Sequence, residues 1–197
     1  MKNKKNLNFI EEYKKSWNFI RESKKFIYSI VGIFFIFSLI GFFITTPTLI
    51  AEQILKFIEE LLLKTQDMGH FELIKFIFFN NTQSSFFGMI FGALFGIFSV
   101  VTTIANGYLL GFVSAMVVSS KGFGVLWRLA PHGIFELPAL FISLGLGLKL
   151  GMFFLEKDKA KTFRNYLWNS LRVFLYIIIP LLLVAALIEG TLIFFSS

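Results

Sequence analysis

Long apolar segments constrain the fold of this chain more than any other feature of its sequence. An α-helix needs about 20 predominantly apolar residues, rising about 1.5 Å each, to cross the hydrocarbon layer of a membrane. The segments that meet this length are 26–46, 84–105, 134–154 and 171–195. Because 56% of the 197 residues are hydrophobic and 16% are charged, the apolar surface exceeds what a soluble domain of this size buries. The sequence therefore predicts an all-α protein, a polytopic transmembrane helical bundle.

A fifth apolar segment, 108–120, is shorter than the others. Its 13 residues would reach only about 20 Å as a helix, so it is either a short tilted span or half of a re-entrant pair. Loops rich in Lys and Arg tend to stay in the cytoplasm. Segments 1–25 and 155–172 carry net charges of +5 and +3, whereas 46–82 carries −2. About five spans satisfy this pattern, in a multi-pass protein of the cell (cytoplasmic) membrane with its N-terminus in the cytoplasm.

The chain divides into a short N-terminal helix and one membrane domain. Residues 1–25 repeat apolar and basic side chains at helical spacing, which predicts a cytoplasmic amphipathic basic helix on an anionic leaflet. A solvated basic lead-in to the first span fits the same pattern. Residues 26–197 are predicted to form a single transmembrane domain. Within it, the amphipathic segment 47–82 faces outward, and its helical periodicity over 49–64 suits a lid or a docking surface.

Glycines recur at four-residue spacing in several of the spans. Small residues let membrane helices approach closely, because burial from water supplies no association drive inside a bilayer. This spacing favours packing within one bundle, with a homodimer contact as the alternative. The glycines predicted to pack are Gly88, Gly92 and Gly96 in the second span, Gly107 and Gly111 in the third, and Gly145, Gly147 and Gly151 in the fourth.

Polar residues at membrane depth are costly, so they mark either a site or a polar joint. His132 and Glu136 are four residues apart and share one face of a helix. Asn106, in a predicted tight turn between the second and third spans, and Glu189, near the end of the last span, are also at depth. These four residues form the predicted polar intramembrane cluster, which is either structural or able to hold an ion or a proton.

Helix-breaking residues surround His132 and Glu136. Pro131 and Gly133 suit the first turn of a helix, and Pro138 removes one backbone hydrogen bond further along. Broken helices beside a carboxylate build ion sites in many transporters, and they also let ordinary membrane helices turn.

Several classes of function find no support in the sequence. The chain has no cysteine, and His132 with Glu136 supplies only two of the ligands that a zinc site requires, so neither a metal nor another cofactor is expected. Its serines lie on apolar segments without a His–Asp partnership, so enzymatic activity is not expected. The net charge of +7 is explained by segments that flank the membrane, so nucleic acid is not an expected partner.

Four short motifs resemble the stage II sporulation protein M family. They are Asn80-Asn81-Thr82, the run 106–111, Pro131-His132-Gly133 followed by 136–139, and the run 185–190. The resemblance covers most of the chain, and the Pro-His-Gly-x-x-Glu element is its most specific part. It implies an integral membrane protein of about five spans, found in many bacteria and archaea. In spore formers, the family's named member works with two cell-wall hydrolases of the engulfment machinery and looks like their membrane anchor. The resemblance implies no catalytic residues.

Two functions stay open on this basis. As a membrane scaffold or anchor, the chain would bind the lipid bilayer and recruit protein partners through the outward region 49–79 and the basic N-terminal helix. As a channel or transporter, it would use Asn106, His132, Glu136 and Glu189 as a midplane polar site, opened by the Pro138 and glycine breaks.

Overall fold

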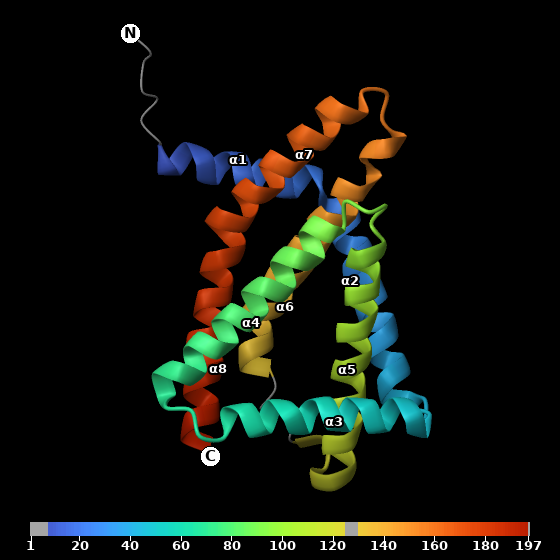
Figure 1. Ribbon diagram of the computed structural model, residues 1–197, viewed down its shortest axis with the longest axis vertical. Helices are drawn as coiled ribbons and strands as arrows, with labels where there is room; N and C mark the ends of the chain where they lie inside the picture. The colour runs from blue at the N-terminus through green and yellow to red at the C-terminus, as the bar shows by residue number, and fades with distance from the viewer. Residues whose placement is uncertain (1–7, 125–129, 197) are drawn as a thin grey trace.

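The computed structural model describes residues 8–124 and 130–196, apart from the side chains of 130–132 and 196. Its regular elements in that part of the chain are all helices, as Figure 1 shows. They are α1 (Phe9–Glu22), α2 (Lys24–Phe43), α3 (Thr48–Thr65), α4 (His70–Phe91), α5 (Ile97–Lys121), α6 (Ala130–Gly151), α7 (Lys159–Val173) and α8 (Ile179–Ser196), with a 3-10 turn at Met152–Leu155 and a π turn at Phe174–Ile178. The predicted all-α bundle is confirmed.

Local sequence signals set several of the helix starts. The backbone amide of Gly69 donates a hydrogen bond of 3.0 Å to Oε2 of Glu72, which fixes the first turn of α4. The carboxylate of Asp158 accepts a 3.2 Å hydrogen bond from the amide of Lys161 and caps α7. The π turn before α8 lies just ahead of Pro180, whose missing N–H cannot continue a regular ladder.

Helix α6 is the centre of the bundle and contacts α2, α4, α5 and α8. Helices α2 and α5 pack on each other over the most extensive interface, and α4 and α8 form a second pair. Figure 1 shows α1 and α7 lying across one end of the bundle and α3 lying across the opposite end. These are called the α1–α7 end and the α3 end below.

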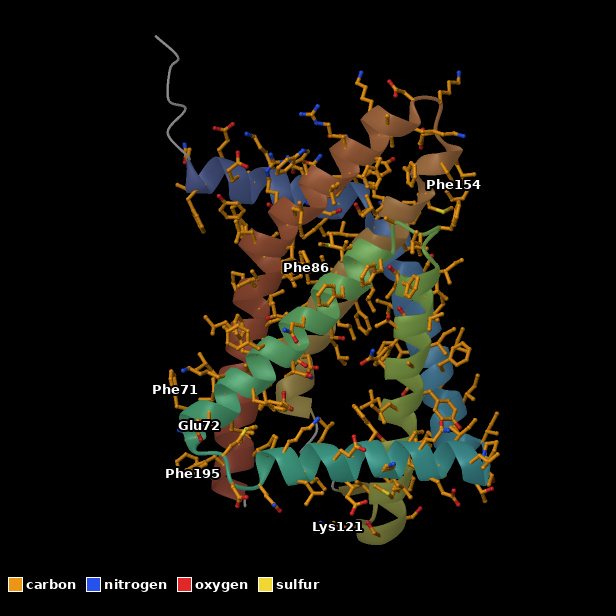
Figure 2. All side chains as sticks on the ribbon, viewed as in Figure 1. Phe71, Glu72, Phe86, Lys121, Phe154 and Phe195 are labelled. Carbon is orange, nitrogen blue, oxygen red and sulfur yellow. The ribbon has the colours of Figure 1, made fainter. Side chains whose placement is uncertain are left out.

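Four helical segments are long and apolar enough to span a membrane: Lys24–Phe43, Ile97–Lys121, Gly133–Leu155 and Lys159–Phe195. Helix α4 also runs from one end of the bundle to the other (Figure 1), although its centre is polar. Helix α4 is not among the four candidate spans, so a fifth crossing formed by α4 stays a prediction. Lys121 and Phe195 lie at the α3 end and Phe154 at the opposite end, as Figure 2 shows.

The course of the second and third crossings differs from the sequence prediction. Residues 84–105 do not form one span, because α4 ends at Phe91 and the chain reverses before α5 begins at Ile97. Asn106 and Gly107 do not form a turn, because α5 is continuous through both, so 108–120 is part of a full crossing of 25 residues. Hydropathy detects apolar length and cannot detect a reversal made of apolar residues.

The reversal at 92–96 depends on close contact with α6. Phe95 and Gly96 adopt left-handed backbone angles, with φ of 56° and 75°, and glycine takes that conformation without steric cost. A Cβ on Gly92 would lie 2.6 Å from the carbonyl carbon of Gly147, and one on Gly151 would lie 2.7 Å from the carbonyl carbon of Phe95. The turn therefore rests directly on the backbone of α6.

Candidate functional site

Two carboxylates on different helices lie within electrostatic range of each other inside the bundle. Glu136 of α6 and Glu189 of α8 are both half-buried, and their charges interact. Glu136 is about 9 Å along α6 from the α3 end, and Glu189 is about 10 Å from the end of α8 at the same side, at about 1.5 Å per residue. The pair therefore lies in the half of the bundle nearer α3 rather than at its midplane.

Hydrogen-bonding capacity is left unused at Glu189 and, separately, on α4. Oε2 of Glu189 is buried and has no hydrogen-bond partner among the described residues, and the same holds for the hydroxyl of Thr82 on α4. Thr82 belongs to a polar run, 80–85, in the middle of that helix. A carboxylate with a buried oxygen left free, within electrostatic range of a second acid, can hold a proton or accept a cation.

Asn106 is not brought to this pair. Its side-chain nitrogen donates a 2.8 Å hydrogen bond to the carbonyl of Thr102, one turn back in α5. At about 1.5 Å per residue, Asn106 lies about 22 Å from the α3 end of its helix, well above Glu136 and Glu189. The Asn106 amide therefore forms its hydrogen bond within α5. In the described part of the chain, the expected four-residue cluster is reduced to the two acids.

His132 and Pro131 have side chains that lie outside the described part of the structure. Their backbones belong to the first turn of α6, which starts at Ala130 and also contains Gly133. Pro138 lies inside α6, and the helix continues through it to Gly151. The expected helix break at Pro138 is therefore absent, because the surrounding turns keep their own backbone hydrogen bonds.

Every glycine predicted to pack lies against a neighbouring helix. Gly107 and Gly111 of α5 approach the carbonyl oxygens of Phe34 and Ser38 on α2. A Cβ on Gly147 would lie 2.8 Å from the Cα of Met89 on α4. The remaining contacts are Gly88 with Leu144, Gly92 with Gly147, Gly96 with Leu148, Gly145 with Ile27, and Gly151 with Gly92 and Gly96. Close backbone approach is a structural role, and it holds α6 in the centre of the bundle.

Buried serines, which the sequence pattern did not single out as structural, join the helices around α4. The hydroxyl of Ser143 on α6 donates to the carbonyl of Ser85 at 2.6 Å, and the hydroxyl of Ser99 on α5 donates to the carbonyl of Gly88 at 2.9 Å. All four residues are buried. The only sequence signal was the presence of hydroxyl residues on apolar helices, which does not reveal their partners.

A buried lysine near the α1–α7 end is a second feature that sequence reasoning missed. Lys149 is 6% exposed, and its ammonium donates to the hydroxyl of Ser23 at 3.0 Å. The same ammonium lies 3.9 Å from the ring centre of Phe19 and 5.0 Å from that of Tyr166. A cation enclosed by aromatic rings is stabilised by their electron-rich faces. Lys149 therefore ties α6 to α1 and α7.

A partly buried ion pair also connects α1 with α7. Nε of Arg172 lies 2.5 Å from Oε2 of Glu12, and Nζ of Lys15 lies 2.9 Å from Oε1 of the same carboxylate. Hydrogen bonds from Lys15 and Arg172 hold the pKa of the Glu12 carboxyl below its usual range.

His70 connects the start of α4 to α8. It begins α4, its Nε2 is 3.0 Å from the hydroxyl of Thr191 on α8, and its ring stacks on Phe194. Among the described residues, no group of three His, Cys, Asp or Glu side chains could hold a metal ion. The expectation of no metal stays a prediction, because the His132 side chain lies outside that set.

Comparison with known proteins places the chain among membrane proteins of one family. The family model described as "Stage II sporulation protein M" matches residues 30–192. An uncharacterized protein of Methanocaldococcus jannaschii is 30% identical over 175 residues, which is 86% of this chain and 78% of that protein. No solved structure matches the chain.

Proposed function

Since the chain belongs to the stage II sporulation protein M family, we propose that this integral membrane protein is a scaffold or anchor that recruits protein partners at the cell membrane. One observation carries the proposal. Helix α3 has no buried residue and lies across the end of the bundle instead of packing into it.

The two faces of α3 differ in chemistry and in exposure. Ile54, Ile58 and Leu61 are partly covered, whereas the other large apolar residues of α3 and most of its polar residues are exposed. The exposed polar residues are Glu52, Gln53, Lys56, Glu59, Glu60 and Lys64. An amphipathic helix of this kind lies in the membrane interface and presents its polar face to water. That face suits a partner with a basic surface.

A cross-linking experiment tests this role for α3. A photoreactive amino acid at Gln53 should give a discrete protein adduct in native cells, and reversing the charge of Glu59 and Glu60 to Lys should abolish it. The same probe at Ile58, on the inward face of the same helix, is the matched control. An adduct from Ile58 equal to that from Gln53, or one unaffected by the charge reversal, would contradict recruitment by this face.

The proposed orientation places α1 and α7 in the cytoplasm, following the excess of Lys and Arg in 1–25 and 155–172. The chain has no cysteine, so Gln53→Cys and Lys161→Cys each provide one labelling site. In intact cells a membrane-impermeant maleimide should label Gln53→Cys and leave Lys161→Cys unmodified. The reverse pattern would place the basic segments outside.

A channel or transporter is the second candidate, and the Glu136–Glu189 pair favours it. Purified protein in liposomes would then conduct protons or cations, and Glu136→Gln would abolish that flux in a folded protein. Glu52→Gln, an exposed carboxylate on α3, is the matched control. Absence of flux in the wild-type protein across a panel of common ions would favour the scaffold.

A further inference from the structure

The outward face of α4 carries polar side chains deep in the membrane. Asn80, Gln83 and Ser84 are exposed, whereas Ile74 and Met89, on the opposite side of the helix from Gln83 and Asn80, are buried against the bundle. Helix α4 has 22 residues, or about 33 Å, and Asn80 lies about 15 Å from its start. These polar groups are therefore at the level of the hydrocarbon layer.

Neither amide is satisfied within the described part of the chain. Asn80 and Gln83 make no hydrogen bond there, although each side chain has two N–H donors and an oxygen acceptor. Water would satisfy such groups on a soluble protein, but hydrocarbon offers no hydrogen bond. Exposed amides at this depth are therefore stabilised by a partner that supplies both donors and acceptors.

The same face is hollowed between its side chains. A shallow hollow of about 340 Å³ is lined by Lys75, Phe76, Phe79, Asn80 and Gln83, all from α4. Such a hollow on a single helix leaves room for side chains of a second helix lying alongside.

We propose that two copies of this chain pair through α4, about a two-fold axis along the membrane normal. Both copies then cross the membrane in the same direction, so Asn80 and Gln83 meet their own counterparts at equal depth. An amide is self-complementary because it both donates and accepts, so identical residues satisfy one another across such an axis. A partner of different sequence would need its own amides at this depth.

The flanking residues are compatible with this pairing. Exposed Phe79 and Phe87 enclose the amides on both sides with apolar surface. The ammonium of Lys75 lies 4.5 Å from the ring centre of Phe71, and Phe71 lies at the α3 end (Figure 2). The Lys75 charges of the two copies therefore do not face each other within the membrane. Like charges are therefore directed toward the aqueous boundary.

Cross-linking through introduced cysteines tests the proposal, since the chain has none of its own. In lipid nanodiscs or native membranes, Gln83→Cys should form a disulfide-linked species of twice the chain mass under mild oxidation. Ile36→Cys is the matched control, because Ile36 is 57% exposed in the middle of α2. Equal yields from the two variants, or an adduct of any mass other than twice the chain, would overturn the proposal.

A second measurement separates pairing by the amides from chance encounter. The double variant Asn80→Leu, Gln83→Leu should weaken dimerisation about tenfold, measured as energy transfer between labelled copies at increasing lipid dilution. Folding should be unaffected, because neither side chain has an internal hydrogen bond to lose. Unchanged energy transfer in the leucine variant would refute a role for the amides even if the cysteines cross-link.

Discussion

Replacing Gly111 by alanine should separate the two helices of the largest interface. A Cβ at this position would lie 2.8 Å from the carbonyl carbon of Ser38 and 2.9 Å from the amide nitrogen of Phe42, and closer still to the Ser38 oxygen. All three atoms belong to the backbone of α2, so no side-chain rotation can relieve the clash. Helix α2 must therefore move away from α5 and lose contacts along its length.

Overpacking of this kind costs about 1–3 kcal/mol. Alanine also favours the helix over glycine by about 1 kcal/mol, so the raw effect of the substitution understates the clash. Gly32→Ala on α2 removes this ambiguity, because nothing lies within 4 Å of a Cβ there. It receives the same propensity gain without the clash. The difference between the two variants should therefore be about 1–3 kcal/mol, or about 5- to 150-fold in the folded-to-unfolded ratio.

Reversible unfolding in mixed micelles, with both variants at the same detergent composition, measures this difference. The Gly111→Ala transition should come at a lower denaturing detergent fraction than that of Gly32→Ala. Coincident transitions would refute the inference that backbone contact at Gly111 sets the distance between α2 and α5.

Three further outcomes follow from other contacts. Removing the hydroxyl in Ser143→Ala should destabilise the bundle by about 1 kcal/mol by unfolding in micelles, because the carbonyl of Ser85 loses its inter-helix donor; no change would mean that another group replaces it. Lys149→Glu should lower the free energy of unfolding by about 2 kcal/mol or more in the same assay, because it sets a carboxylate against aromatic faces. Lys149→Met keeps the side-chain volume and should lower it less. Equal losses of stability in the two variants would refute the role of the cation. The pKa of Glu12 is lowered in the folded protein. Its contact with Arg172 should therefore contribute full stability above the unfolded pKa of about 4.3, and this contribution should be lost as the pH falls through the lower folded pKa. Hydrogen exchange in α1 and α7 should therefore rise at acid pH, and Glu12→Gln should remove that rise; an equal rise in the variant would place the acid sensitivity elsewhere.

Much of the candidate site could not be placed from sequence, for reasons that particular residues illustrate. Glu136 and Glu189 are 53 positions apart in the chain, and their proximity follows from α6 and α8 crossing in opposite directions. Asn106 is also a polar residue within an apolar segment, but its side chain donates its hydrogen bond within α5, at a different depth. Lys149 was not singled out, because it stands near the end of a span, where snorkelling to water is the ordinary expectation.

The reversal of the chain at 92–96 was similarly hidden. Six polar residues at 80–85 suggest the edge of a membrane segment to a hydropathy window, and the apolar residues that follow suggest its interior. In the structure this run is the middle of α4, and the apolar residues form its end, a turn and the start of α5. The structure has four candidate spans among the described residues, and the predicted fifth crossing falls on α4, whose centre is polar.

The sequence by itself determined that this protein is an all-α membrane bundle with charged flanks, because apolar length and charge distribution act through the solvent and do not depend on neighbours. The family motifs are equally local. Only the tertiary structure decided where the chain reverses, which acids lie within electrostatic range of each other, which lysine is enclosed and which face of α4 is exposed. Those features depend on helix-to-helix contact, and within a bilayer that contact is selected by close packing and hydrogen bonds between distant residues, not by hydrophobicity.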